Sequence, residues 1–84
     1  MITTQFNRDA KQHVKPMTLR GAELTSRETE VALYTTQGKT EPEIAEILYR
    51  SLKTIKTYTG NIHKKADVHS RFEMTAAVIQ EHPE

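Results

Sequence analysis

Apolar residues recur along this chain at three- and four-residue intervals, the spacing of one helix face, and no stretch of the sequence alternates as a strand would. In the segment 51–66, a rotation of about 100° per residue collects these positions on one side. That side consists of Ile55, Tyr58, Thr59, Ile62 and Ala66. The opposite side includes Lys53, Lys56, Thr57, Gly60 and Lys64. We therefore expect a helix that packs on one face and is basic on the other.

Helix starts are marked by a Ser or Thr with a Glu three residues later, because this pair can satisfy two orphan backbone N–H groups in a capping box. The pair occurs at Thr25, Thr40 and Ser70, and Ser51 can cap a further helix. The predicted helices cover about 25–37, 40–48 and 51–66, and a fourth begins at residue 70. Core positions outside the third helix are expected at Val31, Ala32, Tyr34, Ile44, Ala45 and Leu48.

Only about three residues, Tyr49 to Ser51, separate the second and third predicted helices. So short a link makes two helices cross steeply, which is the arrangement of a helix-turn-helix. The predicted fold class is all-α, with four helices in one domain over residues 24–82.

Residues 1–23 are expected to form an N-terminal arm ahead of this domain. Phe6, Ala10 and Val14 have helical spacing, whereas Pro16 and Gly21 bracket a break. The pattern leaves both a short helix and a mobile arm open.

Composition indicates one small domain in a reducing compartment. The chain has 84 residues and no cysteine, which excludes disulfides and thiolate metal sites. No apolar run is long enough to span a bilayer, and the N-terminus lacks the apolar segment of a signal peptide. A cytoplasmic protein is expected.

Charge is distributed unevenly, although the net charge is only +1. Between Arg50 and Arg71 there are six Lys or Arg residues against Asp67 alone, and the segments on both sides are acidic. One basic segment framed by acidic ones is typical of a domain that presents a single face to a polyanion. A solvated helix with incidental lysines is the alternative.

The order and spacing of short motifs resemble the LuxR/GerE family of DNA-binding domains over about residues 24–79. The motifs are Leu24 to Val31, Gln37-Gly38, Glu43-Ile44-Ala45, Leu48, Ser51, Thr54-Ile55-Lys56, Asn61-Ile62, Lys65, Val68, Ser70-Arg71 and Glu73. The resemblance implies a four-helix domain whose third helix enters the DNA major groove and which dimerises through its fourth helix. The sequence departs from the family pattern at four positions. Arg50 stands where the family usually has an aliphatic residue, and Tyr58 where it often has His. Ala66 stands where the family has Leu, and Asp67 where it has Gly or Asn.

The resemblance also implies roles for single residues. Lys56 and Thr57 would face base edges or nearby phosphates, and Thr54 and Lys64 would contact the DNA backbone. Gly60 either lets the helix approach the groove floor or is a tolerated weakness of about 1 kcal/mol relative to Ala. The full set of predicted DNA-binding residues is Lys53, Thr54, Lys56, Thr57, Gly60, Asn61 and Lys64.

The fourth predicted helix carries two apolar stripes. Met74, Ala77 and Val78 form one stripe, which is assigned to the core. Phe72, Ala76 and Ile79 form the other, which is assigned to a two-fold partner. The alternative is that Phe6 and Val14 of the arm cover this second stripe within one chain.

Catalysis, cofactors and metals are not expected. His13, His63, His69 and His82 lack the spacing and companions of a metal site, and no nucleophile has an evident base. Glu41, Glu43 and Glu46 are expected to be a solvated acidic face, with a contact to RNA polymerase as the second interpretation.

The sequence therefore predicts a bacterial transcription regulator that binds double-stranded DNA specifically, as a homodimer. Such a protein is expected to be associated with the nucleoid when it is bound to DNA. The alternative is an interaction module that modulates another regulator or RNA polymerase and has little DNA affinity of its own. With about twenty residues ahead of the domain, a stand-alone regulator without a receiver or ligand-sensing domain is expected.

Overall fold

The computed structural model describes residues 14–83 and contains four helices and a short strand pair. The strands are β1 (Thr18–Leu19) and β2 (Ala22–Glu23). The helices are α2 (Ser26–Thr36), α3 (Glu41–Leu48), α4 (Leu52–Ala66) and α5 (Arg71–Glu81). The all-α, four-helix prediction is confirmed. No helix in the described part is long and apolar enough to cross a membrane.

The helix starts follow the predicted caps, with one difference. Thr25 and Thr40 each form a complete capping box with the Glu three residues later. The Ser70 hydroxyl accepts a hydrogen bond from the Glu73 N–H, but the Glu73 carboxylate accepts its bond from the His69 N–H at 2.6 Å. The third box is therefore incomplete, and the expectation of a reciprocal pair at Ser70 was wrong. The carboxylate reaches one residue further back and still stabilises the same helix start.

The helix ends depend on left-handed backbone at three places. Gly38 has a φ of +87° just beyond α2, as expected for a residue without a Cβ. Tyr49 ends α3 and Asp67 ends α4 with φ values of 56° and 54°. An Asp tolerates this conformation better than most residues, which explains how it stands where the family usually has Gly or Asn.

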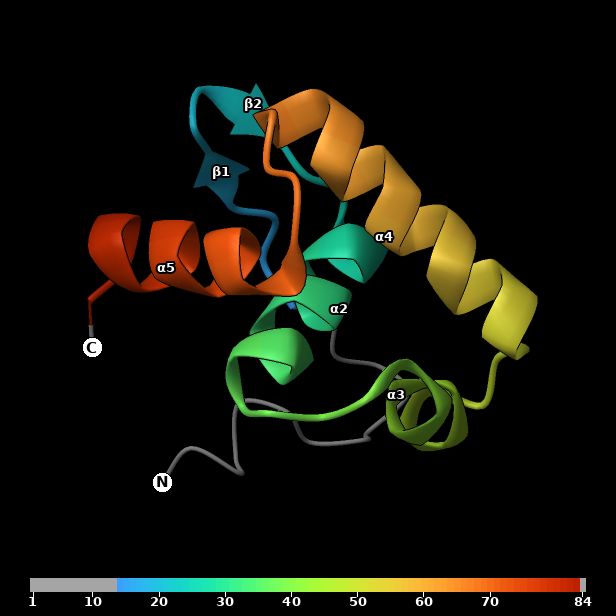
Figure 1. Cartoon of the computed structure of the whole chain (residues 1–84). Helices are drawn as coiled ribbons and strands as arrows, with labels where there is room; N and C mark the ends of the chain where they lie inside the picture. The colour runs from blue at the N-terminus through green and yellow to red at the C-terminus, as the bar shows by residue number, and fades with distance from the viewer. Residues whose placement is uncertain (1–13, 84) are drawn as a thin grey trace.

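Helix α2 lies at the centre of the molecule, with α4 and α5 diverging on either side and α3 at the N-terminal end of α4 (Figure 1). The predicted core positions on α2 and α3 are buried, and so are Ile55, Ile62 and Ala66 of α4. Ile44, Ile55 and Ile62 are completely buried. Leu19 and Val68 are also completely buried, which the helical pattern did not predict.

The described residues before α2 contain a β-hairpin at 18–23, an element that the sequence did not predict. Thr18 pairs with Glu23 and Leu19 with Ala22, and the two loop residues Arg20 and Gly21 both have positive φ. This is a type I′ turn, whose twist matches that of the flanking strands. Phe6 and Ala10, which the helical spacing included, lie outside the described residues.

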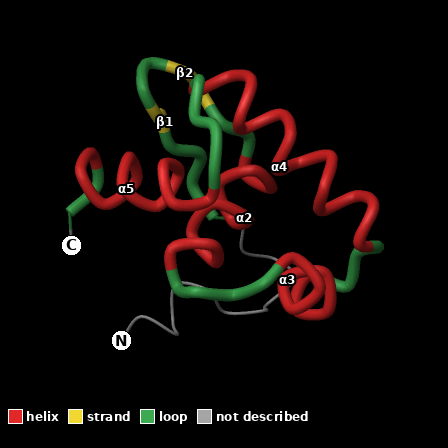
Figure 2. The backbone as a smooth tube through the Cα atoms, viewed as in Figure 1, coloured by secondary structure: helices red, strands yellow, loops and turns green. Residues whose placement is uncertain are grey.

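The hairpin joins the C-terminal ends of α4 and α5. The Arg20 backbone N–H donates to the Glu81 carboxylate at 2.9 Å, and the Arg20 guanidinium donates to the Asp67 carbonyl at 3.0 Å. The tube in Figure 2 shows the two strands above α5, with β2 beside the end of α4. These contacts make residues 17–24 a structural part of the helical domain.

Candidate nucleic-acid interface

The link between α3 and α4 is as short as predicted and sets α4 on the outside of the molecule. Tyr49 turns the chain in the left-handed region, and the Arg50 N–H donates to the Ala45 carbonyl at 2.9 Å. The Ser51 hydroxyl then accepts a hydrogen bond from the Thr54 N–H at 3.1 Å and starts α4. Helix α4 therefore crosses α3 and presents its outer side along one edge of the molecule (Figures 1 and 2).

The two faces of α4 are as the sequence predicted. Ile55, Ile62 and Ala66 are buried, and Tyr58 and Thr59 are half-buried at the flanks. Thr54 is also half-buried, because it lies in the first turn beside Ser51. The other predicted DNA-binding residues are exposed and share one outer surface, made by Lys53, Lys56, Thr57, Gly60, Asn61 and Lys64.

Two of these side chains already have partners within the chain. The Lys56 ammonium lies 3.0 Å from the Glu41 carboxylate at the start of α3. The Thr57 hydroxyl donates to the Lys53 carbonyl at 3.1 Å, one turn earlier in α4. This hydrogen bond fixes the orientation of the Thr57 side chain, so its methyl group has a defined position on the outer surface.

Gly60 occupies open space on the same surface. A Cβ built at this position meets no atom within 4 Å, so no neighbouring group in the described structure requires glycine here. The packing of this chain therefore does not explain Gly60, and the close approach of another molecule stays a prediction.

The second apolar stripe of α5 faces outward, as predicted. Phe72 is 80% exposed and Ile79 is 57% exposed, whereas Met74, Ala77 and Val78 are buried. An open groove of about 430 Å³ runs along this stripe. It is lined by Thr35, Thr36, Gly38, Arg71, Phe72, Thr75, Ala76 and Ile79. The stripe is a surface that lacks a cover in the described part of the chain.

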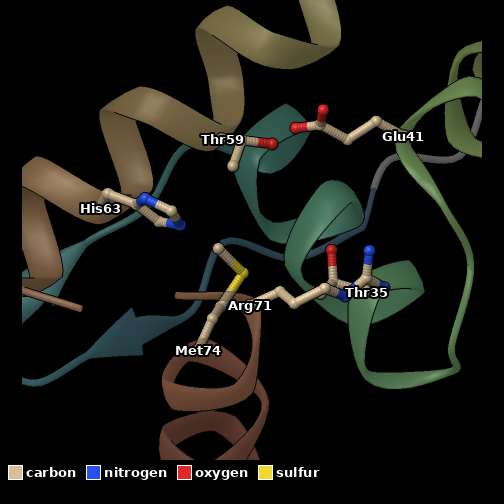
Figure 3. Close-up of a pocket in the computed structure, with 6 residues that line it drawn as sticks. All are labelled: Thr35, Glu41, Thr59, His63, Arg71 and Met74. Carbon is tan, nitrogen blue, oxygen red and sulfur yellow. The ribbon is translucent and has the colours of Figure 1, made fainter. Parts of the chain in front are cut away.

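A pocket behind α4 contains several polar side chains and was not predicted from the sequence. It has a volume of about 250 Å³ and contains Glu41, Thr59, His63 and Arg71 from three different helices (Figure 3). The His63 Nε2 is buried there without a hydrogen-bond partner in the described structure. Because separate helices bring these residues together, no local pattern in the sequence could have grouped them.

The Glu41 carboxyl connects this pocket to the outer surface. Burial raises its pKa, but hydrogen bonds from Lys56 and Thr59 and the charges of Lys56 and Arg71 outweigh burial, so the pKa is lowered from 4.5. Glu41 is therefore ionised near neutral pH and places a negative charge beside Lys56.

A short turn between two helices, the second of which is basic outside and apolar inside, defines a helix-turn-helix domain of the kind that presents one helix to DNA. The chain matches the family described as "Bacterial regulatory proteins, luxR family" over residues 22–78. The chain belongs to this family, and the match confirms the resemblance noted in the sequence. The family is one of regulatory proteins and not of enzymes.

Three relatives with similar sequences are response regulators or transcriptional regulators by name. The chain is 43% identical over 58 residues to the uncharacterized response regulatory protein YgeK of Escherichia coli, across 69% of this chain and 40% of the relative. It is 42% identical over 59 residues to the transcriptional regulatory protein LiaR of Bacillus subtilis, across 70% and 26%. For the response regulator protein VraR of Staphylococcus aureus, the identity is 41% over 56 residues, across 67% and 25%. The chain thus spans less than half the length of these relatives.

Proposed function

We propose that this protein is a sequence-specific DNA-binding regulator of transcription that inserts α4 into the major groove. The observation that carries the proposal is the outer surface of α4, which gathers lysines, Thr57, Gly60 and Asn61 on a helix held from behind by Ile55 and Ile62. A major groove admits one α-helix, and side chains on its outer face then reach the base edges.

The surface residues divide by the chemistry they offer. Lys56 lies in the second turn of α4 and can donate to guanine O6 and N7. The Thr57 methyl can contact the methyl group of thymine. Thr54 and Lys64 lie toward the two ends of the helix, where the DNA strands pass, so they are assigned to phosphates. Lys53, Gly60 and Asn61 complete the surface that faces the groove.

The same proposal includes a homodimer formed through α5. Phe72, Ala76 and Ile79 form an exposed apolar stripe on a helix that already buries its other stripe. A symmetric pair of such helices would cover both stripes at once and set two α4 helices about one DNA turn, roughly 34 Å, apart.

The test is selection of bound sequences from a randomised DNA pool, followed by titration of selected and random DNA at one salt concentration. A specific regulator is expected to enrich a two-fold symmetric motif and to prefer it by about 10³-fold or more. Equal affinity for the two DNAs would contradict the proposal.

The exposed α5 stripe also supports a second candidate, an interaction module that pairs with another regulator. This candidate predicts little DNA affinity for the protein alone. The titration separates the two, because an interaction module would bind neither DNA tightly at moderate salt.

A further inference from the structure

The Lys56–Glu41 pair has a geometry that bears on how DNA sequences are distinguished. The Lys56 Nζ lies 3.0 Å from the Glu41 Oε1, and their side chains are 61% and 28% exposed. Glu41 belongs to α3 and Lys56 to α4, so the pair joins the two helices of the helix-turn-helix. The carboxylate is the anchored partner, because it also receives a hydrogen bond from Thr59 and lies near Arg71 (Figure 3).

An ammonium group has three N–H donors, and only one of them is needed for the ion pair with Glu41. The remaining donors can still reach the O6 and N7 acceptors of a guanine. A phosphate, in contrast, attracts Lys56 mainly through its net charge, and Glu41 neutralises that charge. Because of Glu41, Lys56 keeps its capacity to donate hydrogen bonds to a base but loses much of its attraction to phosphates.

We propose that Glu41 is a specificity-determining residue, which restrains Lys56 from binding phosphates and so weakens binding to random DNA more than binding to the selected site. This inference rests on the proposed DNA-binding function and adds a positioning residue that makes no base contact itself. It also explains why an acidic residue lies beside a basic surface.

The experiment compares wild type with Glu41→Gln, which removes the charge and keeps a polar side chain at the start of α3. Affinity for random DNA is expected to rise about two- to fivefold, the range of an exposed ion pair. The plot of log affinity against log salt should steepen by about one unit, because one more phosphate is neutralised. Affinity for the selected site should change less, so the preference for that site falls.

Two controls separate the action through Lys56 from a general effect of charge. Glu46→Gln removes the same charge from an exposed position of α3 that is outside the pair, and should leave the salt slope unchanged. In a Lys56→Met background, Glu41→Gln removes a repulsion but provides no new phosphate contact, so the slope should again stay unchanged. Glu41→Ala should reproduce the effect of Glu41→Gln, and circular dichroism establishes that each variant is folded.

The outcomes are distinct. If wild type prefers the selected site but Glu41→Gln leaves the random-DNA slope unchanged, the inference is overturned and the proposed function stands. The inference is also overturned if Glu46→Gln steepens the slope equally, or if the steepening persists without Lys56. If wild type has no preference between the two DNAs, the proposed function fails and the inference fails with it.

Discussion

At the scale of single residues, the outer surface of α4 separates side chains that could contact bases from side chains that could contact phosphates. Lys56 lies in the second turn of α4 and is paired with Glu41, whereas Lys64 is exposed in the last turn. The same residue type is therefore expected to act differently at the two positions. This difference can be measured, because base contacts and phosphate contacts respond differently to DNA sequence and to salt.

Lys56→Ala is expected to weaken binding to the selected site by about 1–3 kcal/mol, more than it weakens binding to random DNA. Stability should change little, because Lys56 is exposed and its ion pair with Glu41 is worth about 0–1 kcal/mol. Gel-shift titration with both DNAs measures the difference. Equal losses for selected and random DNA would remove Lys56 from the base-reading residues.

Lys64→Ala is the companion variant at the other end of the surface. It is expected to weaken selected and random DNA alike and to reduce the salt slope by about one unit, because one phosphate contact is lost. Titration over a range of salt concentrations measures this slope. A loss confined to the selected site would contradict the phosphate assignment.

Gly60→Ala tests whether the missing side chain serves DNA binding. Since a Cβ at residue 60 meets nothing within 4 Å, the substitution should stabilise the fold by about 0.5–1 kcal/mol. If the helix backbone approaches the groove floor at Gly60, the same substitution weakens DNA binding. Urea unfolding and gel shifts on one preparation measure both effects. A more stable variant with unchanged affinity would show that Gly60 is only a weak point in the helix.

At the scale of elements, α5 has two separate tasks. Its Met74, Ala77 and Val78 side packs against the core, and its Phe72 and Ile79 side borders the open groove. The two stripes can be altered independently, because the first is buried and the second is more than half exposed.

Ile79→Glu should therefore leave the fold intact, within about 0.5 kcal/mol, and abolish pairing on DNA, because a charge would be buried in the interface. Gln80→Glu is the matched control, since it adds the same charge at an exposed neighbouring position. Sedimentation with and without DNA measures the number of chains per site. A folded Ile79→Glu variant that still binds as a pair would place the interface elsewhere.

At the scale of the whole molecule, one buried carboxylate connects three elements. Glu28 of α2 is 3% exposed, caps its own helix through Thr25, and lies 2.7 Å from the Lys65 ammonium of α4. Lys65 also donates to the Glu23 carbonyl of β2 at 3.3 Å. Lys65 thus connects α4 to both α2 and β2.

This arrangement gives a pH dependence of stability. Burial raises the pKa of the Glu28 carboxyl, but the hydrogen bond from Lys65 and the bonds with Thr25 outweigh burial, so the pKa is lowered from 4.5. A group whose pKa is lowered by folding stabilises the native state fully above its unfolded pKa and stops doing so as the pH falls through the folded value.

Glu28→Gln is accordingly expected to cost about 1–3 kcal/mol at neutral pH, the cost of leaving a buried partner unsatisfied. The ordinary pKa of a Glu carboxyl is 4.5, and folding lowers the pKa of Glu28 below this value. The difference in unfolding free energy between wild type and Glu28→Gln should therefore become smaller below pH 4.5. Urea unfolding between pH 3 and pH 7 measures the unfolding free energies of both proteins. Glu46→Gln is the control, because residue 46 is exposed and the substitution should change stability by about 0.5 kcal/mol or less. A loss of stability that does not vary with pH would mean that the charge of Glu28 does not contribute and that only the packing of its side chain does.

The sequence alone determined the helices and their faces. Caps and apolar spacing are local properties, so the residue order by itself assigns Thr25, Thr40 and Ser51 to helix starts. The exposed surface of α4 and the outward stripe of α5 follow from the same spacing, and the structure confirms that they are exposed. Their roles in DNA binding and in pairing stay predictions.

Only the tertiary structure decided the contacts between elements. The hairpin at residues 18–23 is too short for an alternating pattern, and its Arg20-Gly21 turn lacks the usual Asn-Gly signal. Leu19 becomes a core residue because the hairpin folds against α4 and α5. Glu41 meets Lys56, and Glu28 meets Lys65, across 15 and 37 positions of the chain. Helical periodicity places a side chain on a face of its own helix, whereas its partner on another helix depends on how the helices cross, which no local pattern contains.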